Sequence, residues 1–157
     1  TGSGQAGHTH YEISNYARPG YQSRHNLKYW NGEEYIGLGA GSHSFVNEKR
    51  CAFSADIDTY IKQMLSGDYR FEVEEYIDEE KRKWDEVAFG LRLVQGIDTQ
   101  RLAARYGKGF IEKVRNKMAP FFEEGYVAEQ DNHLLLTEKG ILLYDAIAAE
   151  IISGAGC

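Results

Sequence analysis

The first third of the chain has the pattern of short strands. Residues 10–16 (HYEISNY) alternate apolar and polar side chains, which predicts a strand that the pair Pro19-Gly20 ends in a turn. Residues 34–46 (EYIGLGAGSHSFV) form an apolar stretch that predicts a second strand, and residues 50–53 predict a short third one. The glycines of the second strand allow another group to approach its backbone closely.

A helix and a charged stretch follow these strands. From Ile57 to Leu65 the apolar residues recur at the helical period, with Asp56 in the N-cap position and Gly67 in the C-cap position. Residues 72–86 are dense in charges, which is typical of a solvated face. We place a domain boundary near Tyr69 to Ile77.

The second half of the chain has the pattern of a helical domain with one hairpin. Asp78 and Asp98 are predicted helix caps, and Asp131-Asn132 is a good turn pair for the hairpin. The expected elements are helices at 78–94, 99–106 and 110–124, strands at 126–128 and 133–137, and a helix at 138–152. This order predicts a winged-helix-like domain. We expect its core to include Trp84, Leu91, Val114, Phe121, Leu135 and Leu143.

Composition narrows the class of protein. The 157 residues are 42% hydrophobic, enough for a core, and no apolar run reaches the length of a membrane span. Cys51 and Cys157 are far apart in the sequence and form no CxxC pattern, so we expect a cytoplasmic protein without an export signal. The net charge of −6 argues against unspecific binding of nucleic acid. The aromatic content of 13% indicates either a ring-lined pocket or ordinary core packing.

Three blocks in the first third carry a resemblance to a known family. They are YEISNYARPG at 11–20, RHNLKYW at 24–30 and GLGAGSHSF at 37–45. Together they resemble the YEISNxAxPG, HNxxYW and GxGxGxHSF blocks of the oxygen-independent coproporphyrinogen III oxidase-like radical-SAM proteins, in the branch regarded as heme chaperones. The second half is similar to the C-terminal domain of that family through three shorter runs, GLRL at 90–93, GYV at 125–127 and LLTEKG at 135–140.

The resemblance implies an α+β fold. Terminal strands of a partial (β/α) radical-SAM barrel would be followed by a winged-helix-like, mainly helical C-terminal domain. Residues 1–7 would then be a flexible lead-in or a cloning remnant, residues 8–70 the C-terminal edge of the barrel, and residues 78–152 the C-terminal domain. Strands 10–16 and 34–46 would lack their barrel neighbours, so we expect the chain to self-associate through them.

The resemblance also implies a [4Fe–4S] cluster and S-adenosylmethionine in a longer parent protein. That family holds its cluster with a CxxxCxxC motif near the start of the barrel, and this sequence contains no such motif. Without three thiolates the cluster has no ligands. We therefore expect this chain to be a catalytically inactive C-terminal fragment of a heme chaperone or of an oxidase that acts on coproporphyrinogen.

His25 is the first candidate for a ligand of heme iron. A neutral imidazole is a good axial ligand, and the rings of Tyr29 and Trp30 are suited to stack on or edge a porphyrin. The resemblance associates this HNxxYW block, which includes Asn26, with heme binding. In the alternative interpretation, His25 and Asn26 form a hydrogen-bonded loop corner while the two rings pack beneath the sheet. The residue types leave both interpretations open.

The glycine-rich block supplies a second group of candidates. In the wider oxidase family the corresponding strand lines the S-adenosylmethionine region, so the resemblance implies that Gly41, Ser42 and His43 contact cofactor or substrate in the intact protein. The true oxidases carry an apolar residue where His43 stands, which makes this match weaker. Glycines that make room for a packed helix are the alternative.

The remaining candidates have simpler interpretations. His8 and His10 are spaced for one strand face, but no third metal ligand accompanies them. His133 is expected to face solvent. Cys51 is expected to be a buried small residue rather than a nucleophile, because no His–Asp pattern accompanies it.

The rival hypothesis is a winged-helix module that binds nucleic acid or another protein. The predicted helix at 110–124 has a modest basic face. Its cations are Lys113, Arg115 and Lys117, with Lys108 just ahead of the helix. Three glutamates in the same segment and the overall acidity offset them, so we expect a tetrapyrrole rather than nucleic acid as the partner.

Overall fold

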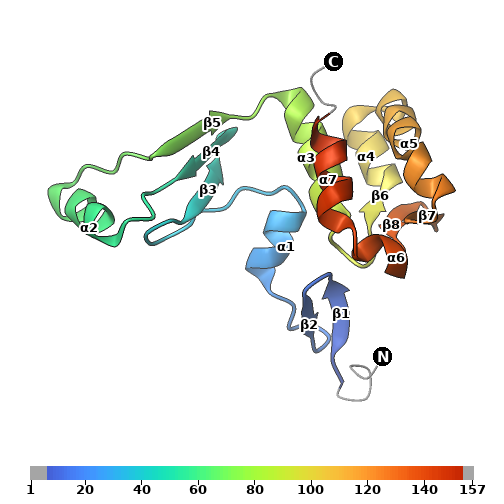
Figure 1. Ribbon diagram of the computed structural model, residues 1–157, viewed down its shortest axis with the longest axis horizontal. Helices are drawn as coiled ribbons and strands as arrows, with labels where there is room; N and C mark the ends of the chain where they lie inside the picture. The colour runs from blue at the N-terminus through green and yellow to red at the C-terminus, as the bar shows by residue number, and fades with distance from the viewer. Residues whose placement is uncertain (1–6, 154–157) are drawn as a thin grey trace. The chain divides into compact units, whose positions relative to one another are not determined.

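The computed structural model describes residues 7–153 and has a mixed α and β architecture (Figure 1). The chain divides into two compact units: the first joins the chain up to Gly32 with the chain from Glu80 onward, and the second comprises Glu33–Glu79. Except for Gly7, the predicted lead-in lies outside the described residues, as does Cys157. None of the described helices has the length and apolar character needed to span a membrane.

The predicted strand at 10–16 is a hairpin instead. Strands β1 (Thr9–Glu12) and β2 (Asn15–Ala17) are antiparallel, and the chain reverses at Ile13 and Ser14. Alternation of side chains continues through this tight turn, so periodicity alone did not reveal it. The predicted turn at Pro19-Gly20 is confirmed.

The RHNLKYW block is helical rather than a loop. Helix α1 (Arg24–Trp30) begins after Ser23, whose hydroxyl accepts a hydrogen bond from the backbone N–H of Asn26 at 3.3 Å. This N-cap satisfies one of the donors at the start of the helix. None of the residues of α1 is fully buried.

The rest of the first unit is a helical layer around a small sheet. The predicted turn pair Asp131-Asn132 is confirmed, because both residues have positive φ (49° and 64°) between paired strands. The sheet has the order β6-β8-β7, with all pairs antiparallel. The strands are β6 (Ile97–Asp98), β7 (Val127–Gln130) and β8 (His133–Leu136). The helices are α3 (Glu79–Gly90), α4 (Thr99–Tyr106), α5 (Lys108–Glu123), α6 (Glu138–Ile141) and α7 (Tyr144–Ser153).

The core prediction is confirmed in part. Trp84, Leu91 and Val114 are buried, and Phe121 packs against the same cluster. Two positions are wrong: β8 buries the leucines on either side of Leu135, and Leu143 is 42% exposed. The run of three leucines in β8 is apolar on both faces, so only strand pairing decides which of them point inward.

Two of the predicted helices also differ from the helices in the structure. Helix α3 stops at Gly90 rather than near Val94, because the segment after it leaves the helix and pairs with β1: the N–H of Ile13 donates to the carbonyl of Arg92 at 3.0 Å. The last predicted helix is divided into α6 and α7.

The second unit contains a sheet in the order β3-β4-β5 and one helix. Only the end of the predicted 34–46 strand is a strand, since Gly39 and Gly41 have positive φ (111° and 69°) and bend the preceding chain. The charged stretch, predicted as a solvated face, contributes β5, which pairs with β4. The elements are β3 (His43–Val46), β4 (Lys49–Ala52), α2 (Ile57–Ser66) and β5 (Val73–Tyr76). The predicted caps of α2 are confirmed.

Gly140 offers a test of the packing between α6 and β7. An added Cβ would lie 1.9 Å from the carbonyl oxygen of Tyr126, so we expect Gly140→Ala to lower the free energy of unfolding by about 1–3 kcal/mol. Gly109 in α5 is the matched control, because its added Cβ would meet no atom within 4 Å. Gly109→Ala should leave stability unchanged or slightly higher in urea denaturation. Equal effects of the two substitutions would contradict this packing.

Candidate functional site

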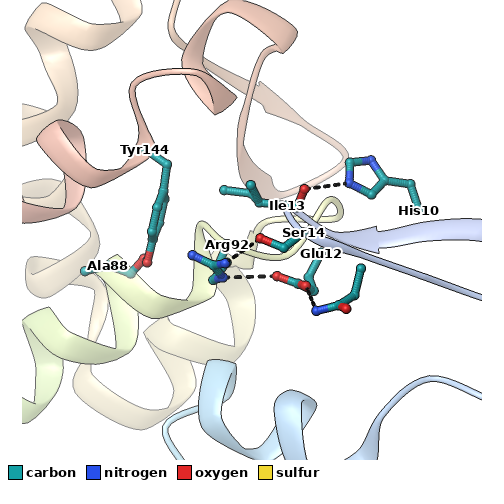
Figure 2. Close-up of polar contacts among 8 residues, drawn as sticks. His10, Glu12, Ile13, Ser14, Ala88, Arg92 and Tyr144 are labelled. Carbon is teal, nitrogen blue, oxygen red and sulfur yellow. Dashed lines mark hydrogen bonds and ion pairs between the residues drawn. The ribbon is translucent and has the colours of Figure 1, made fainter. Parts of the chain in front are cut away.

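A buried ion pair joins the N-terminal hairpin to the segment after α3 (Figure 2). The side chain of Glu12 has no exposed surface, and its Oε2 accepts a hydrogen bond from Arg92 Nε at 3.0 Å. Its other oxygen accepts a hydrogen bond from the Asn15 side chain. Arg92 also donates through Nη2 to Ser14 Oγ at 2.7 Å. Both carboxylate oxygens are therefore engaged, as a buried charge requires.

Backbone pairing supports this ion pair on both sides. The N–H of Ile13 donates to the carbonyl of Arg92, and the N–H of Val94 donates to the carbonyl of Tyr11 at 3.2 Å. Glu12 itself forms an antiparallel bridge with Leu93. The N-terminal hairpin is thus attached to the turn that follows α3.

Two aromatic rings flank the guanidinium group of Arg92. Its central carbon lies 4.5 Å from the ring centroid of Trp30 and 5.3 Å from that of Tyr144, both within the range of a cation–π interaction. Burial raises the pKa of Tyr144, whose hydroxyl donates to the carbonyl of Ala88 at 3.4 Å. Arg92 therefore joins α1 and α7 to the hairpin.

Four predicted site residues lie on α1. His25 is exposed near the start of the helix, and Asn26 participates in its N-cap. Tyr29 and Trp30 are partly buried at its end; Tyr29 contacts the ring of Phe89, with 5.8 Å between centroids. The helix thus exposes its imidazole while its two rings pack against the unit.

The other three predicted residues belong to the second unit. The N–H of Gly41 donates to the carbonyl of Ser54 at 2.7 Å, and Ser42 Oγ donates to the carbonyl of Gly39 at 2.7 Å. His43 is exposed at the start of β3. These bonds organise the glycine-rich loop.

The first unit contains two cavities that α1 helps to line. One has a volume of about 200 Å³ and is lined by Trp30 together with residues of α3 and α4. The other, of about 360 Å³, is lined by Leu27, β1 and the segment after α3. Helix α1 and the segment after α3 line both cavities.

The remaining histidines include one in the lining of each cavity, His10 in the larger and His133 in the smaller. His10 stacks on Tyr16 with 4.4 Å between ring centroids, and His133 bonds the carbonyl of Asp131 through Nδ1 at 3.0 Å. The predicted burial of Cys51 is confirmed, and burial raises the pKa of its thiol. Within residues 7–153, no three His, Cys, Asp or Glu side chains are grouped to hold a metal ion.

Sequence reasoning did not find the Glu12–Arg92 pair. The alternation at 10–16 places Glu12 among the polar positions of the predicted strand, so periodicity does not indicate its burial. Arg92 stands between two leucines, which is the one local sign that its charge needs a partner. Eighty residues separate the two, so the sequence does not show which partner it is.

The chain is similar to several known proteins. Residues 73–143 match the sequence model of the HemN C-terminal domain. The described fold has a TM-score of 0.66 to the coproporphyrinogen III oxidase HemN from Escherichia coli, which is described as a radical SAM enzyme. That likeness covers 96% of this chain and 38% of the oxidase, at 15% sequence identity.

The relatives found by sequence are named as heme chaperones. The chain is 30% identical over 133 residues to the heme chaperone HemW of Bacillus subtilis, covering 85% of this chain and 35% of the relative. It is 29% identical over 147 residues to HemW of Mycobacterium tuberculosis, covering 94% of this chain and 36% of the relative. The chain thus spans about a third of the length of these relatives. The predicted resemblance to the C-terminal part of this family is confirmed.

The buried ion pair generates a prediction about stability. Replacing Glu12 by Gln removes the negative charge but keeps the size of the side chain, which leaves Arg92 without its counter-charge. We expect a loss of about 3–5 kcal/mol in the free energy of unfolding, measured by urea denaturation.

Glu129→Gln is the matched control, because it breaks the exposed pair with Arg115 in the same unit. Exposed pairs contribute about 0–1 kcal/mol, so this variant should remain close to the unmodified protein. A Glu12→Gln variant as stable as this control would show that the buried pair does not hold the unit together.

Proposed function

We propose that this chain is the C-terminal part of a longer cytoplasmic radical-SAM protein that carries or modifies a tetrapyrrole, either a heme chaperone or a coproporphyrinogen oxidase. The observation that carries the proposal is the junction at Arg92. There the YEISN, HNLKYW and GLRL runs contact one another through Glu12, Trp30 and Arg92. The names of the sequence relatives favour the chaperone.

In this proposal, residues 8–70 form the edge of a radical-SAM barrel and residues 78–152 form a winged-helix-like domain. The order of α3, α4, α5 and the β7–β8 hairpin supports the second assignment. The Glu12–Arg92 pair would connect the two parts, since the hairpin that carries Glu12 belongs to the barrel edge. The domain would thereby help to exclude water and oxygen from the barrel.

The cluster and S-adenosylmethionine belong to the parent protein in this proposal. The chain contains two cysteines, fewer than the three thiolates that the cluster needs, and Cys51 is buried. The residues present therefore do not fit the cluster. By itself the chain would be catalytically inactive.

His25 is the proposed ligand of heme iron. Its exposure on α1 leaves the imidazole accessible to a large planar ligand, with Asn26 beside it. Tyr29 and Trp30 fix the far end of the helix through Phe89 and Arg92, so the imidazole is presented from a rigid support. Gly41, Ser42 and His43 would contact cofactor or substrate in the parent.

The nucleic-acid alternative has little in its favour. Arg115, one of the four cations in its proposed basic face, is paired with Glu129 at 2.6 Å. The overall net charge is −6. Both facts reduce the attraction to phosphate.

Self-association is expected from the apolar chain around 34–46. Leu38 in this stretch is 88% exposed. We expect the average mass in light scattering to rise with concentration, and Leu38→Lys to reduce that rise because it puts a charge on the apolar contact. Leu142→Lys is the matched control, since Leu142 is 83% exposed in the first unit. A monomer at every concentration would refute self-association.

Heme titration tests the ligand assignment. In the full-length parent, His25→Ala should weaken heme binding, followed by the Soret band, because the iron loses its protein imidazole. His133→Ala is the control for the iron ligand and should leave the Soret position of bound heme unchanged, since His133 lies on strand β8 and not on α1. If the His25 variant binds heme as tightly as the unmodified protein, His25 is not the ligand.

A further inference from the structure

We propose that the cavity beside Trp30 is a binding pocket for a carboxylate group. The cavity has a volume of about 200 Å³ and lies entirely within the first unit. Its walls include Trp30, Glu86, Asp98, Arg101 and His133. Some of the polar groups in these walls already have hydrogen-bond partners, whereas others do not.

The indole of Trp30 provides an unsatisfied donor. Its Nε1 is buried and has no hydrogen-bond partner among the described residues. An indole N–H only donates, and a buried donor without an acceptor is unfavourable. Since Trp30 lines the cavity, an occupant that carries an acceptor oxygen would satisfy it.

The two acidic side chains in the walls are already engaged. Asp98 Oδ1 caps α4 and accepts hydrogen bonds from the backbone N–H groups of Gln100 and Arg101 at 2.8 and 3.0 Å. Glu86 Oε2 accepts from Arg105 Nη1 at 2.8 Å and from Tyr106 Oη at 2.7 Å. Glu86 is thus paired with a cation and Asp98 Oδ1 with the start of α4, and neither is bonded to the indole of Trp30.

Arg101 provides the positive charge. Its Nη2 lies 4.0 Å from Glu86 Oε1, a long separation for an ion pair, and its side chain is 54% exposed. A guanidinium group has five N–H donors and binds carboxylates well. Trp30 and Arg101 therefore offer donors to the same cavity, which favours an anionic acceptor over a neutral one.

The volume limits the size of the occupant. A cavity of about 200 Å³ has the volume of roughly six or seven water molecules. It admits a small carboxylic acid or one carboxylate arm of a larger ligand, but not a whole porphyrin. A propionate group has a suitable size.

Indole NMR signals test the pocket directly. The chain has two tryptophans, so the 15N-labelled protein should give two indole signals, which Trp30→Phe assigns. Titration with sodium propionate should shift the Trp30 signal saturably and leave that of Trp84 in place. Sodium chloride at equal ionic strength and neutral propionamide should not reproduce the shift.

Arg101→Gln separates a carboxylate pocket from a water-filled one. Because a hydrogen bond to a charged group is lost, propionate affinity should fall by about tenfold or more. Lys113→Gln, on the exposed side of α5, is the control and should bind normally. No saturable shift, an equal shift with propionamide, or unchanged affinity in Arg101→Gln would each overturn the proposal. If Trp30→Phe does not fold, Arg101→Gln still decides the question.

The source of the carboxylate can be distinguished in the same experiment. Metal-free protoporphyrin carries propionate groups and serves as the second probe. Its use rests on the proposed tetrapyrrole function. A shift of the Trp30 signal at lower concentrations of porphyrin than of propionate would assign the pocket to a tetrapyrrole arm. A shift with propionate alone would assign it to a free small acid, while the heme titration of His25→Ala tests the proposed function separately.

Discussion

The first unit depends on one buried ion pair, between Glu12 and Arg92. Glu12 has no contact with solvent, so its charge is tolerable only because Arg92 and Asn15 satisfy both carboxylate oxygens. The same guanidinium faces the rings of Trp30 and Tyr144. One side chain thereby holds the N-terminal hairpin, α1 and α7 in a single arrangement.

The two ends of α1 have different surroundings in this arrangement. Trp30 and Tyr29 at the end of the helix are occupied by contacts with Arg92 and Phe89, whereas His25 near its start is exposed. A ligand that binds the imidazole would meet a helix whose orientation is already fixed, which reduces the entropy lost on binding. The indole N–H of Trp30 has no hydrogen-bond acceptor among the described residues, and in our proposal the occupant of the cavity supplies one.

The second unit is stabilised by weaker interactions than the first. Its rings form a small cluster in which Phe53 lies 4.7 Å from Phe71 and 5.6 Å from Tyr60, measured between centroids. No residue of α2 is fully buried, and charge pairs such as Lys49–Glu74 connect β4 to β5 at the surface. Exposed pairs contribute little to stability, so this unit should open more readily than the first.

Local features of the fold follow from the amino-acid sequence alone. Helices α2, α4 and α5, the Asp56 and Asp98 caps and the Asp131-Asn132 turn follow from side chains that act within a few residues of one another. The family blocks were equally visible in the sequence.

Other features depend on contacts between distant parts of the chain. These are the burial of Leu134 and Leu136 in place of Leu135, the strand β5 within a charged stretch, and the pairing of Glu12 with Arg92. Each of these depends on a partner distant in the chain, and no local period carries information about such a partner.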